Sequence, residues 1–196
     1  MSTRSDYIKC TLIDSINVKN AILSNERLLE AISKVACACI DALEGGNRIL
    51  LAGNGGSAAD AQHIAAEFVS RFMYDRPGLA AIALTTDTSM LTAIGNDYGF
   101  DHLFERQLEA NARKGDIFIA ITTSGNSPNV LRALARCREL GVISVGLAGN
   151  GGDIQAMCDY LIAVPSDSTP RIQEAHITIS HIICGLVESA MFPRLA

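Results

Sequence analysis

Tryptophan is absent from this 196-residue sequence, and aromatic residues make up only 5% of it. Long hydrophobic runs are missing too. Although 48% of the residues are hydrophobic, no uninterrupted apolar stretch approaches the roughly 18 residues that a membrane-spanning helix needs. The missing run excludes such a helix, so no membrane partner is expected. We predict a soluble protein with an unusually apolar interior or a large subunit interface.

Clusters of basic residues are also missing. The chain has 16 Lys and Arg against 21 Asp and Glu, which gives a formal net charge of -5. Nonspecific binding to nucleic acid depends on grouped Lys and Arg that neutralise phosphates. This balance therefore argues against a nucleic-acid partner and leaves a protein partner open.

The six cysteines show no paired spacing of the kind that binds metal. Cys37 and Cys39 would point to different faces of one helix. Reduced, buried thiols are the expectation, as in cytosolic proteins. An export signal is missing as well, because charged residues from Arg4 to Lys19 interrupt the region where its apolar core would stand. We therefore predict a cytoplasmic protein.

Short apolar runs alternate with helical patterns along most of the chain. Residues 5–44 indicate two helices, ended by Gly45-Gly46, and residues 169–191 indicate a long C-terminal helix. Five apolar runs between them predict strands at 48–52, 79–84, 116–121, 142–147 and 160–164. Buried strands joined by helices favour an α/β fold with a doubly wound, five-stranded parallel sheet. Residues 1–196 are expected to form a single domain.

Two loops rich in glycine and hydroxyl groups follow predicted strands. They are Gly53-Asn54-Gly55-Gly56-Ser57 and Thr122-Thr123-Ser124-Gly125-Asn126-Ser127. Ligands of doubly wound sheets bind beyond the carboxyl ends of the strands, and free amides at a helix start bind anions. Neither loop has the lysine of a nucleotide P-loop, which disfavours a nucleoside triphosphate. We predict phosphate binding, although Ser127 before Pro128 also suits a purely structural helix cap.

The first loop also fits a Gly-x-Gly-x-x-Ala dinucleotide pattern through Gly53, Gly55 and Ala58. A nicotinamide enzyme should then carry an acidic residue about 20 positions on, at the end of the second strand. Asp75 precedes that strand, and Asp87 lies beyond the expected distance. A nicotinamide-dependent oxidoreductase is therefore a minor alternative.

The sequence repeats Leu51-Ala-Gly-Asn-Gly-Gly56 as Leu147-Ala-Gly-Asn-Gly-Gly152. Glycines supply positive φ and permit close backbone approach where a strand turns into a helix. We interpret both copies as strand-to-helix turns rather than as a duplication, since nothing else repeats at that period.

Four side chains are candidates for chemistry beside the first loop. His63 and Glu67 are four positions apart, which places them on one helix face. Because their helix starts from the predicted anion loop, a catalytic or metal-binding role is favoured over a surface pair. Gln173 and His181 are about 12 Å apart along a helix and about 80° apart around it, so both could lean toward one site. His176, Glu174 and Glu188 are expected to be solvated or interface residues.

These segments together resemble the sugar isomerase (SIS) domain family and, within it, the phosphoheptose isomerases. The resemblance spans nearly the whole chain and rests on both loops, His63 with Glu67, Gly95-Asn96-Asp97, and Arg171–Glu174 with His181. It implies a flavodoxin-like fold and conversion of sedoheptulose 7-phosphate to D-glycero-D-manno-heptose 7-phosphate through an enediol. That product would feed bacterial heptose synthesis for the lipopolysaccharide core.

The resemblance also implies residue roles. Glu67 would be the general base and His181 the general acid, and one zinc ion per subunit would be bound by His63, Glu67, Gln173 and His181. Contacts to the phosphorylated sugar would come from Asn54, Gly55, Gly56, Ser57, Glu67, Asn96, Asp97, Thr122, Thr123, Ser124, Ser127 and Gln173. Thr122 stands where many relatives carry serine, and its hydroxyl is expected to serve. The family further implies a homotetramer with interfacial active sites, in which residues 1–45 form a helical extension used in assembly.

The SIS family also contains proteins with a different kind of function. Some SIS proteins are noncatalytic partners of the bacterial replication initiator, and that branch lacks the carboxylate and histidine equivalent to Glu67 and His181. This chain retains both residues. We therefore predict an active isomerase and keep the initiator partner as the alternative.

Overall fold

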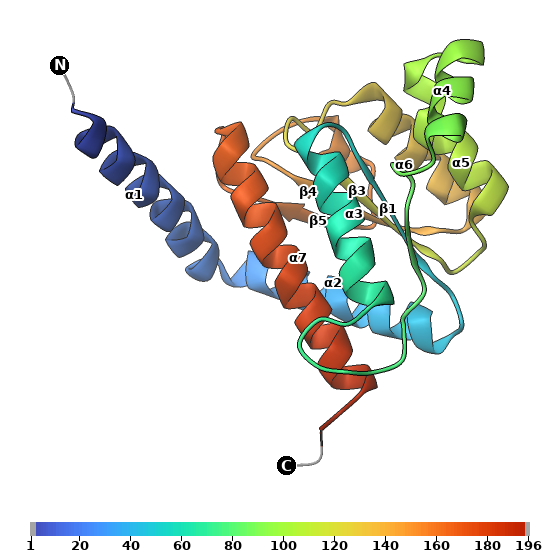
Figure 1. The fold of residues 1–196 in the computed structure, drawn as a ribbon, viewed down its shortest axis with the longest axis horizontal. Helices are drawn as coiled ribbons and strands as arrows, with labels where there is room; N and C mark the ends of the chain where they lie inside the picture. Colours follow the sequence, from blue (N-terminus) through green and yellow to red (C-terminus); the bar gives the residue numbers. More distant parts are fainter. Residues whose placement is uncertain (1–2, 195–196) are drawn as a thin grey trace.

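The computed structural model describes residues 3–194. Two helices open the chain, α1 (Arg4–Leu23) and α2 (Glu26–Glu44). Thr3 starts α1 through a reciprocal capping box with Asp6, and the Asn25 side chain accepts from the backbone N–H of Leu28 at the start of α2. The apolar face of α2 packs into the core, whereas α1 projects from the body of the molecule (Figure 1).

The five predicted strands form one parallel sheet in the order β2-β1-β3-β4-β5. Its strands are β1 (Ile49–Gly53), β2 (Ala81–Ala83), β3 (Ile117–Thr122), β4 (Ile143–Ala148) and β5 (Tyr160–Ala163). Fold class and order are those of a flavodoxin-like doubly wound sheet, so the fold prediction is confirmed. The prediction was wrong on the length of β2. It is an edge strand that pairs only with Ile49–Leu51, so it keeps three residues instead of six.

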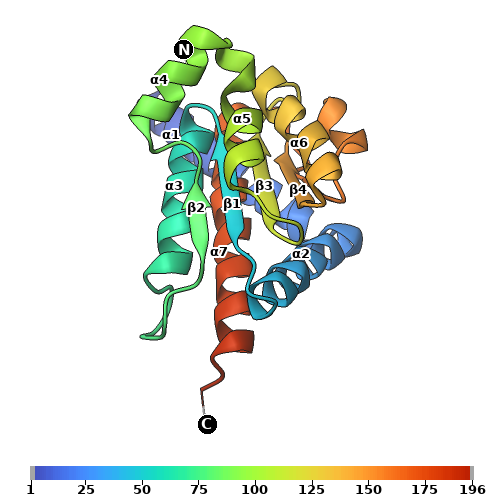
Figure 2. The same cartoon turned by 90° about the vertical axis from the view of Figure 1, so that its right-hand side faces the viewer.

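Helices cover both faces of the sheet (Figure 2). The connections are α3 (Gly56–Val69), α4 (Thr88–Asp97), η1 (Phe100–His102), α5 (Leu103–Asn111), α6 (Pro128–Leu140), η2 (Asp153–Ala156) and α7 (Thr169–Met191). Strand side chains alternate: Leu51 faces a core built with α2, α3 and α7, whereas Leu50 faces one built with α5 and α6. The long final helix has the predicted bounds.

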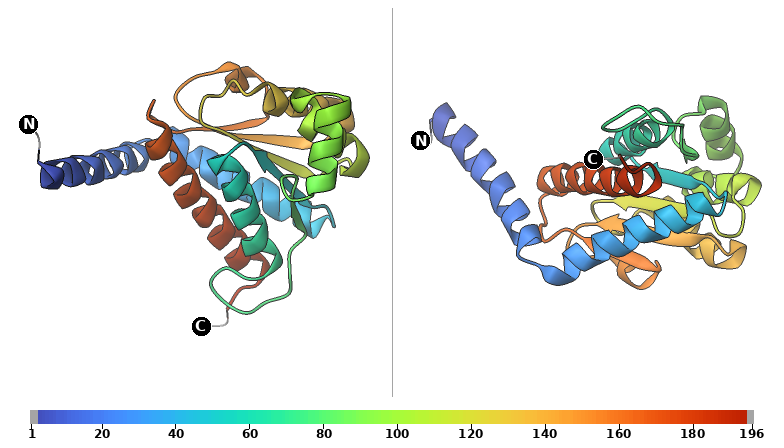
Figure 3. Two further views of the ribbon diagram at one scale, coloured as in Figure 1. Left: turned by 45° about the horizontal axis from the view of Figure 1, so that its top comes forward. Right: turned by 90° about the horizontal axis from the view of Figure 1, so that it is seen from below.

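Helices α3 and α7 lie side by side on one face of the sheet (Figures 1 and 3). A Cβ on Gly56 would meet the Gln173 side chain, and a Cβ on Gly185 would meet Phe72. The start of α3 is therefore level with the start of α7, and the two helices run in the same direction. Within residues 3–194, no helix combines the length and apolar character needed to cross a bilayer.

Candidate functional site

The loop after β1 is shaped by close backbone packing. A Cβ on Gly53 would lie 2.7 Å from the Cβ of Ser57 and 2.8 Å from the carbonyl oxygen of Ile121. Gly55, which precedes α3, has a φ of 56°, which favours glycine. The Ser57 side chain is buried in the first turn of α3. The loop therefore presents the open start of a fourteen-residue helix at the carboxyl edge of the sheet.

The hydroxyl-rich loop after β3 stands next to it, because β1 and β3 are neighbours in the sheet. Thr122 Oγ1 lies 3.0 Å from Ser127 Oγ and 3.4 Å from Ser124 Oγ. Ser127 occupies the N-cap position of α6 as expected, but its side chain makes no capping bond. Asn54 and Asn129 exchange two amide hydrogen bonds, of 2.9 and 3.0 Å, which tie the first loop to α6. This pair of loops lies at the β1/β3 switch point of the fold.

The second glycine-rich copy, after β4, supports the hydroxyl loop. It leads into the short 3-10 helix η2 rather than into an α-helix, which corrects the turn prediction. The Asp153 N–H donates to Asn126 Oδ1 at 2.9 Å, and the Ile154 N–H donates to Gly125 O at 3.1 Å. A Cβ on Gly152 would lie 2.6 Å from Gly125. The repeat therefore packs against the hydroxyl loop and fixes its backbone.

His63, Glu67 and His181 converge between α3 and α7. The Nε2 atoms of the two histidines are 3.0 Å apart, and His63 Nε2 lies 3.3 Å from Glu67 Oε1. One ligand atom from each of the three residues lies within 4.8 Å of the others. His63 is exposed, and Glu67 and His181 are half-buried. The helical spacing predicted the first pair, and the packing of α7 adds His181.

Gln173 lies beside the first loop and not beside His181. Its Nε2 atom is 2.3 Å from the point where a Cβ on Gly56 would stand. Gln173 therefore faces the start of α3, while His181 faces His63 two turns further along. Both side chains do lean toward α3, but they reach it at different levels.

Asn96 and Asp97 end α4, where both are exposed, and Asn96 Nδ2 donates to Asp97 Oδ1 at 2.8 Å. A hollow of about 360 Å³ beside the first loop is lined from α4 by Leu91 and Thr92. Within this single chain, neither Asn96 nor Asp97 lines the hollow beside the first loop. A sugar contact by either residue stays a prediction.

Several expectations for polar residues were wrong. His176 and Glu188 are each only 1% exposed within the chain, so neither is solvated or an interface residue. The expectation for Glu174 is not contradicted, because its side chain is 40% exposed, and it pairs with Arg171 at 2.8 Å. The thiols are not uniformly buried: Cys10 and Cys37 are exposed, while Cys39 is buried on the other face of α2.

Sequence reasoning missed Asp60 and Phe72 beside the cluster and Asn129 beside the first loop. The Phe72 ring lies 5.4 Å from the His181 ring, centroid to centroid. Asp60 stands three positions before His63, and partial burial raises the pKa of its carboxyl against the opposing influence of His63. Its Oδ2 atom is buried without a hydrogen-bond partner among residues 3–194. The helical spacing could have identified Asp60, whereas Phe72 and Asn129 reach the site only through long-range packing.

The structure places neither candidate acidic residue where a dinucleotide-binding enzyme needs one. Asp87 caps α4, with its side chain accepting from the Met90 N–H at 2.8 Å. Asp75 lies in the loop before β2. Neither carboxylate stands at the end of β2, where a ribose would require it.

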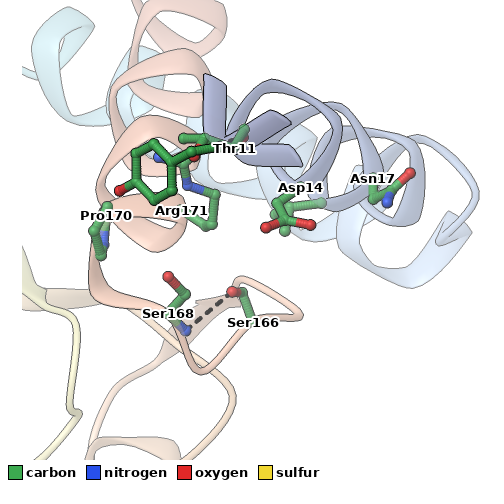
Figure 4. A pocket seen from close by; sticks show the side chains of 9 residues that line it. Thr11, Asp14, Asn17, Ser166, Ser168, Pro170 and Arg171 are labelled. Atoms are coloured by element: carbon green, nitrogen blue, oxygen red, sulfur yellow. Dashed lines mark hydrogen bonds between the residues drawn. The ribbon is translucent and has the colours of Figure 1, made fainter. Parts of the chain in front are cut away.

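A separate hollow of about 490 Å³ lies between α1 and the start of α7 (Figure 4). Arg171 crosses it and donates to the Thr11 carbonyl oxygen at 2.7 Å. Ser166, Ser168 and Asp14 line it as well. This hollow contains none of the predicted site residues.

Fold and site define the chain as a doubly wound α/β protein whose two glycine- and hydroxyl-rich loops stand at the switch point, at one end of the helix that carries His63 and Glu67. The SIS domain family model matches residues 16–149. A phosphoheptose isomerase of Aneurinibacillus thermoaerophilus is 64% identical over 189 residues, which cover 96% of each chain. The chain therefore belongs to the SIS domain family and, within it, to the phosphoheptose isomerases.

Solved structures agree with this membership. Phosphoheptose isomerase GmhA from Neisseria gonorrhoeae is 44% identical with a TM-score of 0.89, covering 95% of this chain and all of that one. A phosphoheptose isomerase from Francisella tularensis is 38% identical with a TM-score of 0.92, covering 96% of this chain and all of that one.

Proposed function

We propose that this chain is an aldose-ketose isomerase that converts sedoheptulose 7-phosphate to D-glycero-D-manno-heptose 7-phosphate. The observation that carries the proposal is the convergence of Glu67 and His181 from two helices beside paired hydroxyl and glycine loops. Relatives named phosphoheptose isomerase over nearly the full length support the same substrate. The product would enter heptose synthesis for the bacterial cell envelope.

The chemistry follows from the side chains. Moving a carbonyl from C2 to C1 requires a base that removes the C1 proton and returns a proton to C2. It also requires an acid that moves protons to and from the oxygens on these two carbons. Glu67 is the carboxylate suited to the first task and His181 the imidazole suited to the second. Thr122, Ser124 and Ser127 would hold the phosphate at the other end, which converts binding energy into orientation.

The cluster also fits a metal ion. His63, Glu67 and His181 offer two imidazole nitrogens and a carboxylate oxygen, a donor set that zinc accepts with a fourth position open. We propose one zinc ion per subunit at these residues, with Gln173 as the more distant fourth candidate. A zinc ion held there would supply Lewis-acid polarisation of a substrate oxygen. Metal analysis of the purified protein should find one zinc per chain, and His63→Ala should lose it.

We further propose a cytoplasmic homotetramer with active sites at its interfaces. The support is the large apolar surface of α1, where Tyr7, Ile8, Leu12, Ile13, Ile16 and Leu23 are all more than half exposed. On α7, Ile182 and Leu186 are exposed near His181. Such surface normally marks an interaction site.

Turnover of sedoheptulose 7-phosphate in the zinc-loaded protein tests the isomerase proposal. Glu67→Gln keeps the size of the side chain but removes both the base and one proposed zinc ligand, so kcat should fall roughly 100-fold or more. Glu105→Gln is the matched control, because Glu105 also pairs with a histidine, His102, at 2.8 Å but on α5. Wild-type protein without turnover would remove the proposal and favour the noncatalytic alternative.

A further inference from the structure

The helix that carries Glu67 ends just beyond it, and Arg76 closes that end. Helix α3 stops at Val69 and has no basic residue in its last turn. The last carbonyls of a helix need partners from outside. Arg76, in the following loop, donates from Nη2 to Glu67 O at 2.8 Å and from Nη1 to Phe68 O at 2.6 Å. Its charge also complements the negative end of the helix dipole.

Arg76 is held by a buried carboxylate on α7. The side chains of Arg76 and Glu188 are 2% and 1% exposed, and Nε lies 3.1 Å from Oε1. Glu188 also accepts from the N–H groups of Phe72 at 2.9 Å and Met73 at 2.7 Å. Desolvation raises the pKa of Glu188, but these hydrogen bonds and Arg76 together hold the pKa below its ordinary value. One ion pair thus fastens the loop after α3 to the helix that carries His181.

The fastened loop places an aromatic ring against the other half of the cluster. The Phe72 and His181 rings are tilted by 32° at 5.4 Å between centroids. The ring packs against α7 at Gly185, where a Cβ would lie 3.5 Å from Phe72 Cε1, an ordinary van der Waals contact. The loop passes around the C-terminal part of α7, as Figure 1 shows. The same junction therefore contacts the backbone of Glu67 and the imidazole of His181.

We propose that Arg76 and Glu188 are positioning residues that fix Glu67 relative to His181. Neither belongs to the three-residue donor cluster, so both act through the end of α3 and the Phe72 ring. The inference rests on the proposed isomerase function. It adds that catalytic geometry depends on a buried pair outside the site.

Arg76→Lys tests the proposal with little change in charge. Lysine offers a single ammonium in place of the guanidinium fork, so it cannot serve two carbonyls and Glu188 together. We expect kcat to fall about 10- to 100-fold, with KM little changed because both loops lie at the other end of α3. Arg48→Lys is the matched control. Arg48 pairs at 3.8 Å with Asp116, which is also 1% exposed, at the amino ends of β1 and β3.

A double variant, Arg76→Met with Glu188→Met, separates positioning from stability. Replacing both members avoids leaving one buried charge unpaired, and it removes the bonds to the Glu67 and Phe68 carbonyls and to the N–H groups of Phe72 and Met73. Because these backbone groups lose their partners, we expect a folded protein with a lower melting temperature, kcat reduced about 10- to 100-fold and zinc bound about tenfold more weakly, as measured by competition with a chelator. Wild-type kcat and zinc affinity in a folded double variant would overturn the proposal. Zinc affinity is measured without substrate, so failure of the positioning proposal can be recognised independently of the isomerase proposal. Failure of the isomerase proposal would show as inactive wild-type protein.

Discussion

Gly53 and Gly56 stand in the same loop for different physical reasons. A Cβ on Gly53 would meet the backbone of Ile121 and Ser57, which cannot move cheaply, whereas a Cβ on Gly56 would meet only the tip of the Gln173 side chain. Gly56→Ala should therefore fold normally but displace Gln173, lowering kcat/KM roughly tenfold or more. Gly53→Ala should lower the free energy of unfolding by about 1–3 kcal/mol. Thermal unfolding and steady-state kinetics check both, and unchanged kinetics in Gly56→Ala would contradict a role for Gln173.

His176 makes stability depend on pH. Burial lowers its pKa to about 4, although the hydrogen bond to Ala148 O opposes this. The unfolded chain, with a histidine pKa near 6.5, then binds more protons than the folded chain between pH 6.5 and 4. Stability contributed by neutral His176 is complete above that window and falls as the pH is lowered through it. The loss should reach about 3 kcal/mol.

Urea unfolding of wild type and His176→Gln at pH 7 and pH 4 measures this term. Glutamine can still donate to Ala148 O but does not titrate. The variant should therefore lose less stability on acidification than wild type. Equal losses in the two proteins would show that His176 is not the group responsible.

The loop between β4 and η2 supports the backbone of the hydroxyl-rich loop, residues 122–127. Gly152 has a φ of 99°, and a Cβ there would lie 2.6 Å from Gly125 and from Ser124 O, whereas a Cβ on Gly151 would meet nothing within 4 Å. Gly152→Ala should displace the hydroxyl loop and raise KM about tenfold, the cost of one weakened charge-assisted hydrogen bond. Gly151→Ala is the matched control. Inorganic phosphate serves as a competitive inhibitor. Its inhibition constant should rise in parallel with KM in Gly152→Ala and stay unchanged in Gly151→Ala.

Local patterns predicted most elements, and long-range packing decided the rest. Apolar runs gave all five strands, and the spacing of His63 and Glu67 gave a pair on one helix face. Glu188 could not be recognised as buried, because its partners Arg76 and Phe72 lie more than 110 positions away in the sequence. The length of β2 likewise depended on how far its neighbour pairs with it.

Helix α1 projects from the molecule and exposes apolar side chains. Leu12 is 59% and Ile16 is 55% exposed, so the helix leaves its apolar face uncovered in a single chain. Leu12→Glu with Ile16→Glu should convert the proposed tetramer to smaller species in light scattering after size exclusion. Ala21→Glu adds a single negative charge about 180° around the helix from Leu12 and should leave the tetramer intact. A wild-type mass of a single chain would contradict the proposed assembly.

The two loops could be placed at one edge from the sequence because parallel strands end together. The relation between α3 and α7 could not, since it depends on long-range packing such as that of Phe72 against Gly185. The sequence therefore supplied candidate site residues, and the packing of α7 brings His63, Glu67 and His181 together.

Isomerisation of sedoheptulose 7-phosphate in deuterium oxide tests the central claim, that Glu67 moves a proton between two carbons of the substrate. If Glu67 does so, the aldose product should carry solvent deuterium on C2, observed by mass spectrometry and NMR, and Glu67→Gln should form almost no product. Product whose C2 hydrogen comes entirely from the substrate, formed at an equal rate by wild type and Glu67→Gln, would contradict it.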